Sequence, residues 1–320
     1  MIVITDIPAL TIHRRFGKAL VSTDATSLKE ASGDPSQDLD LAAFMRECGT
    51  LHLLVGKDTK KRHAKGVVCH TAPQELPPGC LLKLRDGVLV ASIGLALVSA
   101  SRHLDDLTLL RLCYELCADY EIIELPEEGL PSEGGDICHD TYGYRQRTRL
   151  IGIADLRASV ETVAFLRGAK RVLDLLDYVA EGSASPRETD VAMYVWCPHR
   201  LGGYAFPMVG MNQECATEDG PRRNDLLVDK HAGVEYDSDA EHAGARKNSA
   251  DSARKKLLEL AGRKVVSLTN DEVKSPKLFF NSMRLLGRYT GRTVRPPSKR
   301  TKEARDRLHA FVNSPHTPLF

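Results

Sequence analysis

An acidic hairpin in the second half of the chain constrains the fold more than any other feature of the sequence. Apolar residues mark two short strands at 225–228 and 233–237, and the polar residues 229–231 between them suit a hairpin loop. Successive side chains of a strand point to opposite faces, so Glu235 and Asp237 share one face. The sequence therefore predicts a β-hairpin with acidic side chains on one side.

The length of the hairpin loop decides whether a third acid joins these two. A three-residue loop pairs Val228 with Ala232 and sets Asp225 opposite Glu235, which gathers three carboxylates on one patch. A two-residue loop sets Asp225 opposite Tyr236 instead, because a slip of one residue moves a side chain to the other face.

Three close carboxylates repel one another, and a divalent cation removes this conflict. Mg²⁺ prefers a few carboxylates together with water and a substrate phosphate. A bound metal ion can also acidify a water molecule and neutralise charge on a phosphoryl group. On spacing alone, a metal site and a solvated polar hairpin explain the acids equally well.

The wider pattern around the hairpin resembles a nuclease family. It consists of D-L-L, V-E-Y-D, a downstream His242, a helical run with Asp251 and Arg254, and then A-G-R-K-V-V-S-L-T. This order is similar to the very-short-patch-repair-like branch of the PD-(D/E)XK nucleases, over residues 183–275. The resemblance implies a restriction-endonuclease-like α/β fold, with a mixed sheet flanked by helices, and metal-dependent hydrolysis of DNA phosphodiester bonds.

The resemblance also implies roles for individual residues. The catalytic set is Asp225, Glu235, Asp237 and His242, in which His242 acts as a general acid or base or as a phosphate donor. The ligands of Mg²⁺ or Mn²⁺ are Glu188, Asp225 and Glu235.

The sequence departs from the family pattern at several places. Asn224 stands where the family has Pro, residues 238–239 replace a Gly, and Asp237 occupies the place of the Lys in the superfamily name. The alternatives for the role of that Lys are Lys247, Lys255 and His242. Catalytic activity is therefore a separate question from the fold.

The segment Ser185-Pro186-Arg187-Glu188 has two interpretations. It is a capping box with Pro at the first helical position, in which Glu188 caps its own helix, and that helix runs to Trp196. It also resembles the S-P-x-E start of the first helix in this nuclease branch, where a Glu joins the metal cluster. Both interpretations stay open at this point.

Candidate contacts to DNA must be local, because the formal net charge of the chain is only +1. Arg222 and Arg223 precede the acids, and Arg254 and Lys255 lie on a helix expected at 248–261. Arginine forks match phosphate oxygens, so these four residues are candidate contacts to duplex DNA, with a solvated basic face as the alternative. A homodimer is compatible with a double-strand nuclease, although no heptad pattern indicates one.

The cysteines, the N-terminal residues and the length of the apolar runs indicate in which compartment the protein is expected. Eight cysteines without a C-x-x-C pair are typical of core thiols in a reducing compartment. The N-terminus lacks the pattern of a signal peptide, and no apolar run approaches about 18 residues. We therefore expect a cytoplasmic protein with no membrane partner.

Four segments are expected along the chain. They are an N-terminal α+β module at 1–125, a linking loop and helix at 126–182, the nuclease-like domain at 183–295 and a basic C-terminal tail at 296–320. The first module resembles proteins related to AbiEi-type abortive-infection antitoxins through L-H-L-L-V, V-V-C-H and D-G-V-L-V-A-S. Further expected elements are strands at 50–55 and 66–70, a hairpin at 80–90 and a helix at 104–120. A helical stretch is expected at 157–179, interrupted at Gly168, and another at 271–283, broken at Pro276.

The sequence leads to three alternative hypotheses of function. The first is a metal-dependent endodeoxyribonuclease, active in defence or repair. The second is a non-catalytic DNA-binding or antitoxin-like transcriptional regulator that keeps the nuclease fold. The third is a structural module of a defence system that binds a protein partner.

Overall fold

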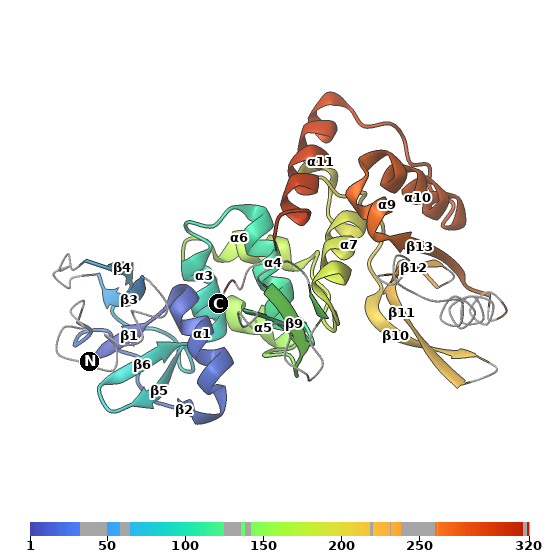
Figure 1. The fold of residues 1–320 in the computed structure, drawn as a ribbon. Coiled ribbons are helices and arrows are strands. Elements are labelled where there is room, and N and C mark those ends of the chain that lie inside the picture. The colour runs from blue at the N-terminus through green and yellow to red at the C-terminus, as the bar shows by residue number, and fades with distance from the viewer. Residues whose placement is uncertain are drawn as a thin grey trace. The chain divides into compact units, whose positions relative to one another are not determined.

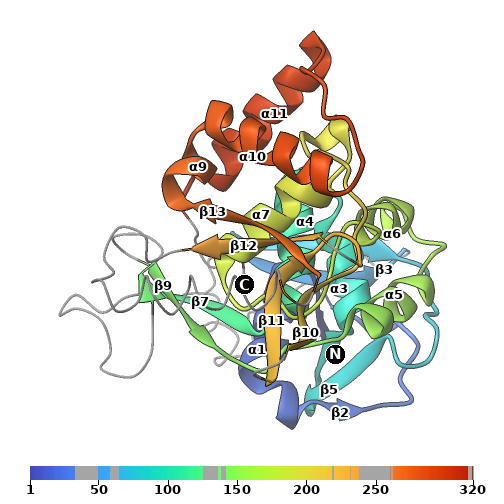
Figure 2. The ribbon, with the colours of Figure 1, turned by 90° about the vertical axis from the view of Figure 1, so that its right-hand side faces the viewer.

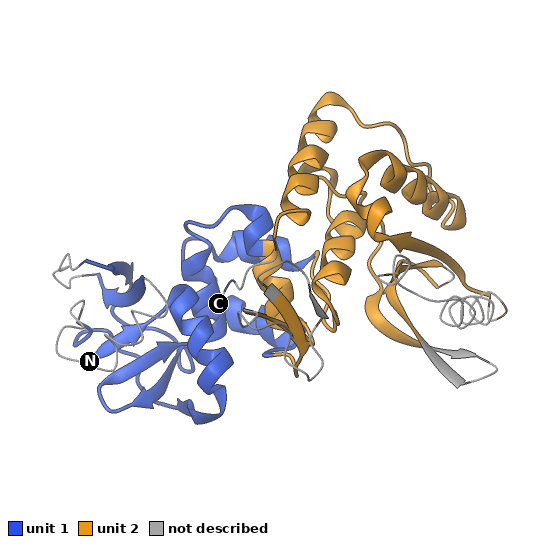
Figure 3. Ribbon diagram, viewed as in Figure 1, with its two compact units in different colours: residues 1–109, 150–177, 319–320 blue, residues 110–149, 178–318 orange. Residues whose placement is uncertain are grey.

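The computed structural model describes residues 1–32, 50–57, 65–124, 136–137, 142–217, 220–230, 232–237, 260, 262–315 and 319. The protein is of the α/β class, with mixed sheets flanked by helices (Figure 1). It divides into two compact units (Figure 3). Unit 1 contains residues 1–109, 150–177 and 319–320, and unit 2 contains residues 110–149 and 178–318.

Unit 1 is built on a six-stranded sheet with the order β2-β5-β6-β1-β3-β4. Its strands are β1 (Ile2–Ile4), β2 (Val21–Ser22), β3 (Leu51–Gly56), β4 (Val67–Ala72), β5 (Leu81–Arg85) and β6 (Val88–Ala91). The first strand lies inside the sheet, parallel to β6 and antiparallel to β3. Val3 and Ile4 are fully buried, as expected for an apolar strand in the interior of a sheet.

Helices α1 (Asp6–Phe16) and α3 (Ile93–Ala100) of unit 1 pack against each other beside this sheet. The strands expected at 50–55 and 66–70 are β3 and β4, which pair in parallel, and the hairpin expected at 80–90 is β5 and β6. Gly87 has φ of 76° in the turn of that hairpin, a conformation that glycine adopts without a steric penalty.

The helical stretch predicted over 157–179 with an interruption at Gly168 consists of two helices, α5 (Ile153–Glu161) and α6 (Ala169–Leu176). The residue before α6, Gly168, has φ of 103°. A Cβ atom there would lie 2.3 Å from the Ser101 hydroxyl oxygen. The predicted interruption is confirmed, because the chain turns at a position that only glycine fits.

Unit 2 contains two sheets and most of the remaining helices. A three-stranded sheet has the order β7-β9-β8, and a four-stranded sheet has the order β10-β11-β12-β13 (Figure 2). The strands are β7 (Tyr120–Glu124), β8 (Asp136–Ile137), β9 (Tyr142–Gln146), β10 (Gly210–Thr217), β11 (Gly220–Leu227), β12 (Ala232–Asp237) and β13 (Lys264–Thr269). The last pair, β12 and β13, is parallel, and the other pairs of these two sheets are antiparallel.

The helices of unit 2 follow from clear local signals. They are α7 (Pro186–Trp196), α9 (Asn270–Lys274), α10 (Pro276–Tyr289) and α11 (Lys299–Val312), and η2 (His199–Leu201) is a short 3₁₀ turn. Ser275 caps α10 and Pro276 is its first residue, so the helix break expected at Pro276 is confirmed. Rings from α7 and α10 meet where Tyr194 and Phe279 have centroids 4.4 Å apart.

The two units group the chain differently from the expected segments. Residues 110–149 belong to unit 2, whereas residues 150–177 belong to unit 1. The segment 296–320, expected as a basic tail, contains α11, whose Leu308 and Val312 are fully buried in the apolar core. Helix α4 (Asp106–Cys117), expected at 104–120, contributes residues to both units.

A buried ion pair lies in the centre of unit 2. The fully buried carboxylate of Asp190 on α7 accepts hydrogen bonds from Arg111 on α4, at 3.1 Å, and from Arg187, at 3.2 Å. The guanidinium of Arg111 also donates to the carbonyl of Phe311 on α11, at 3.2 Å, and lies over the Phe311 ring at 3.9 Å. One acid therefore holds three helices of the unit together.

Within the described ranges, no helix combines the length and the apolar composition that crossing a bilayer requires.

We predict that Asp190→Asn destabilises the protein by about 3–5 kcal/mol, because it leaves buried guanidinium charge without its partner. The matched control is Asp306→Asn, which removes the exposed pair with Lys302 at 2.7 Å and should cost less than about 1 kcal/mol. Urea unfolding of both variants checks the difference, and equal shifts of their midpoints would contradict the role of Asp190.

Candidate functional site

The register of the acidic hairpin follows the three-residue loop. The paired residues are Leu226 with Val234 and Leu227 with Gly233, and the Val228 amide donates to the carbonyl of Ala232 at 3.0 Å. The predicted pairing of Val228 with Ala232 is therefore confirmed. The alternative with a two-residue loop is excluded.

Beyond these pairs, the Asp225 side chain takes part in holding the two strands together. Its Oδ2 atom accepts the backbone N–H of Tyr236 at 2.7 Å. Asp225 is half-buried, as are Glu235 and Asp237 on the facing strand. The backbone of β12 therefore fixes the position of one carboxylate of the acidic patch.

Glu188 lies in the first turn of α7 and forms the predicted capping interactions. Ser185 is the N-cap residue, and its Oγ accepts the Glu188 amide at 3.2 Å. The Glu188 carboxylate in turn accepts the Ala184 amide at 2.9 Å and the side-chain amide of Asn212 at 2.8 Å. The Asn212 contact goes beyond a cap, because it ties the carboxylate to strand β10.

The pKa of Glu188 links this helix to the hairpin. Burial of the carboxyl and then the negative charge of Asp225 raise its pKa from 4.5 to about 7. The effect of Asp225 means that the acid of α7 and the acid of β11 lie within electrostatic reach of each other. Glu188 therefore caps its helix and also interacts electrostatically with an acid of the patch.

The other site residues fall into two groups. Arg223 on β11 is exposed and pairs with Glu214 at 3.0 Å, and Arg222 lies on the same strand. His242, Arg254 and Lys255 lie outside the described residues, as does the helix expected at 248–261. The described acids of unit 2 do not form a group of three with ligand atoms within 4.8 Å of one another.

A groove of about 380 Å³ lies near the far end of α7, and no acid lines it. Its lining includes Arg292, Arg295 and Arg305. The Arg305 guanidinium stacks 3.8 Å from the centre of the Tyr204 ring, and Arg292 donates to the Ala205 carbonyl at 2.7 Å. This concentration of fixed guanidinium groups suits an anionic ligand such as a phosphate.

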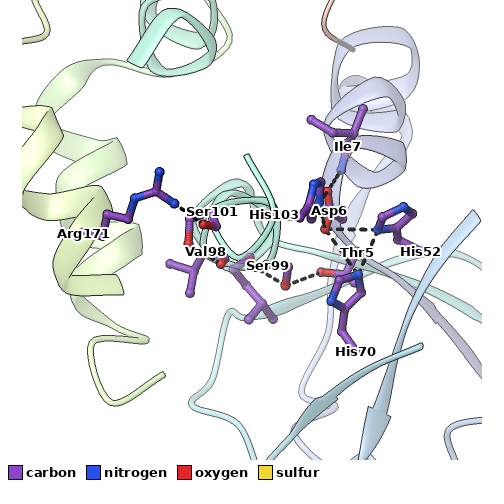
Figure 4. Close-up of polar contacts among 11 residues, drawn as sticks. Thr5, Asp6, Ile7, His52, His70, Val98, Ser99, Ser101, His103 and Arg171 are labelled. Carbon is purple, nitrogen blue, oxygen red and sulfur yellow. Dashed lines mark hydrogen bonds and ion pairs between the residues drawn. The ribbon is translucent and has the colours of Figure 1, made fainter. Parts of the chain in front are cut away.

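Unit 1 contains a cluster that the sequence analysis did not identify (Figure 4). The Oδ2 atom of Asp6 lies 3.1 Å from Nδ1 of His52, 3.3 Å from Nε2 of His70 and 2.9 Å from Nε2 of His103. His52 Nδ1 and His70 Nε2 are 2.8 Å apart. Among the described residues, Asp6, His52 and His103 form a group of possible metal ligands within 4.8 Å of one another.

The sheet of unit 1 assembles this Asp–His cluster. Asp6 follows β1 at the start of α1, His52 is on β3, His70 is on β4, and His103 follows α3. His70 pairs with Leu54, two residues along from His52, so both imidazoles lie on the same face of the sheet. Thr5 holds Asp6 in place, because its amide donates to the His52 carbonyl at 2.9 Å.

The charges in the cluster follow from burial. Burial lowers the pKa of His70 to about 4, against the opposing attraction of Asp6. Burial alone would raise the pKa of Asp6, but hydrogen bonds and charge from His52 and further donors outweigh it, and the pKa lies below its ordinary value. Asp6 is therefore ionised and His70 is neutral at pH 7.

No local pattern in the sequence indicates this cluster, because its members are 18 or more residues apart. The signal in the sequence that could have indicated it was a histidine on each of two predicted strands, which are β3 and β4 in the structure. Only the parallel pairing of these strands and the return of the chain after α3 bring the side chains together.

Comparison with known proteins gives no match for this chain, whether with models of protein families, with curated proteins or with solved structures.

Proposed function

We propose that unit 2 hydrolyses phosphodiester bonds of DNA with a bound Mg²⁺ or Mn²⁺ ion. The observation that carries the proposal is the raised pKa of Glu188, which depends in part on Asp225. Two acids from different elements that destabilise each other's charge are typical of a site where a cation completes the arrangement. Glu188, Asp225 and Glu235 are the proposed ligands.

The order of elements supports this proposal. Helix α7 precedes three antiparallel strands, β10 to β12, and β13 then pairs in parallel with β12. The resemblance to PD-(D/E)XK nucleases implies this order of a helix, three strands and a last core strand. The acids occupy the matching places, on α7, β11 and β12.

The chemistry assigned to each residue follows from its position. When bound, the metal ion supplies acidification of a water molecule and neutralisation of phosphoryl charge. Asp225 is held by the Tyr236 amide, which fixes the position of its carboxylate on β11. Asp237 is two residues from Glu235 on the same strand, where it orients the attacking water or ligates the metal. His242 remains the proposed acid or base.

The arginine groove is the proposed contact to the phosphate backbone. Helix α7 connects Glu188 with this groove. Tyr194 lies about 9 Å farther along α7 than Glu188. The Tyr194 carbonyl accepts the amide of Tyr204, a residue that lines the groove, at 2.8 Å. One strand of duplex DNA carries one phosphate per about 3.4 Å of helix axis, so a few nucleotides would span this distance. Arg222, Arg223, Arg254 and Lys255 stay further candidates for DNA contacts.

The regulator that keeps the nuclease fold is the competing proposal. It is favoured by Asp237 at the place of the Lys, which removes a cation that the family uses in catalysis. Strong, metal-independent and salt-sensitive binding of DNA without cleavage would support this alternative.

We predict that plasmid or duplex DNA is cleaved with Mg²⁺ or Mn²⁺, and that Asp225→Asn and Glu235→Gln each reduce the cleavage rate at least about 100-fold, because each removes charge from the metal site. Asp271→Asn, an exposed acid at the start of α9, is the matched control and should leave the rate unchanged. A rate that is the same in all four proteins would exclude these roles.

A second prediction concerns pH. The folded state holds a proton on Glu188 up to about pH 7, whereas the ordinary pKa is 4.5. Its contribution to stability is complete below the ordinary pKa and is lost as the pH rises through about 7. Between pH 5 and pH 8 the wild type should therefore lose more stability than Glu188→Gln.

Urea midpoints at both pH values, with and without Mg²⁺, measure this difference. Bound Mg²⁺ requires the ionised carboxylate, so it should stabilise the wild type more at pH 8 than at pH 5. An identical dependence on pH in wild type and Glu188→Gln would contradict the assignment.

A further inference from the structure

The Asp–His cluster of unit 1 has the spacing of a metal centre. Ligand atoms around tetrahedral Zn²⁺ are about 3.3 Å apart, because each bond is about 2.0–2.1 Å long. The contacts of Asp6 Oδ2 with the three imidazoles, at 2.9, 3.1 and 3.3 Å, and the 2.8 Å contact between His52 and His70 are close to that value. Imidazole nitrogens are ligands that Zn²⁺ accepts readily and Mg²⁺ does not prefer.

Hydrogen atoms alone do not satisfy these contacts. Asp6 Oδ2, His52 Nδ1 and His70 Nε2 form a triangle in which all three atoms are in mutual contact. If one of the two nitrogens carries a proton, the other faces the ionised carboxylate with a lone pair. If both carry protons, the two N–H groups face each other. A cation bound to Asp6 Oδ2 and His52 Nδ1 removes the conflict.

The surroundings of Asp6 also indicate a ligand. Its side chain is completely buried, and its backbone has φ of 64°, which is unfavourable for a residue other than glycine. Residues held in such conformations are concentrated at functional sites, where neighbouring structure fixes them. Here the Thr5 hydroxyl donates to Ser99, and Asp6 Oδ1 accepts the Ile7 amide at 2.8 Å.

We propose that Asp6, His52 and His103 bind one divalent transition-metal ion, with Zn²⁺ as the test case. His70 Nε2 lies 2.8 Å from His52 Nδ1, beside these three ligands, and is not counted among them. His103 has 42% of its side chain exposed, which gives an ion a path from solvent to a carboxylate that is otherwise enclosed. The ion joins β3, the start of α1 and the turn after α3. It is a structural centre of unit 1, independent of the Mg²⁺ site proposed for unit 2.

The experiment uses the full chain, stripped of metal with a chelator and then titrated with Zn²⁺ by calorimetry. We expect one tight site per chain and a rise in the thermal midpoint when Zn²⁺ is added. Asp6→Asn and His103→Gln should each weaken this site at least about 100-fold, because loss of a ligand exceeds the 10–100-fold effect of losing an outer-shell partner. Asparagine tolerates the left-handed backbone of Asp6, so the fold of this variant should persist.

The matched control is His309→Gln, which removes a half-buried histidine that contacts the Lys274 carbonyl in unit 2. It should leave the tight site intact, which separates the cluster from adventitious binding to other histidines. Substitution with Co²⁺ provides a second readout. The intensity of its visible d–d bands distinguishes four-coordinate from six-coordinate metal, and His103→Gln should abolish the four-coordinate spectrum.

Circular dichroism of the metal-free variants shows that each is folded before it is titrated. Absence of tight binding in the wild type with Zn²⁺, Co²⁺, Ni²⁺ and Fe²⁺ would overturn the proposal. Equal affinity in wild type, Asp6→Asn and His103→Gln would overturn it as well. DNA cleavage does not enter this test, so failure of the nuclease proposal leaves its outcome unaffected.

Discussion

A carboxylate that leaves water needs positive charge, hydrogen-bond donors or a proton, and this requirement determines how both units are assembled. Asp190 receives two arginines, and Asp225 receives a backbone amide from the neighbouring strand. Glu188 has donors and also a raised pKa, so it retains a proton near neutrality. Asp6 has three imidazoles around one oxygen atom. The arrangement around each acid is fixed by the elements that supply these partners.

The acids whose partners do not fully compensate their charge mark the places where a ligand is expected. Asp190 has strong donors on both oxygens, and its role is structural. Glu188 and Asp6 differ from it, because the first remains close to another acid and the second lies in a triangle that protons cannot satisfy. An oxygen-rich site suits a hard cation such as Mg²⁺, whereas a site with two imidazole nitrogens and one carboxylate suits Zn²⁺. The two units are therefore proposed to use different metal chemistry.

Local rules allowed much of unit 2 to be predicted from the sequence. The cap at Ser185 and the register of the hairpin follow from a few adjacent residues, and the structure confirms both. The contact of Asp225 with the Tyr236 amide was not predicted, since periodicity gives the face of a side chain but not its hydrogen bond. The interruption before α6 was predicted at Gly168, and the left-handed φ of 103° at this glycine gives its physical reason.

The Asp–His cluster marks the limit of such reasoning. Its four residues come from separate elements, and their meeting depends on a strand order in which β1 lies between β6 and β3. Sequence spacing cannot provide that order. By contrast, the acids of the hairpin are neighbours along the chain, and their proximity is a local property of two strands.

The contact of Arg111 with Phe311 has a consequence for biosynthesis. The two residues are 200 positions apart, yet the Phe311 carbonyl and ring complete the surroundings of the guanidinium. During translation the guanidinium of Arg111 remains incompletely paired until residue 311 has emerged from the ribosome. Unit 2 therefore matures late, and truncations that remove α11 should yield chains that chaperones and proteases recognise rather than a shortened native protein.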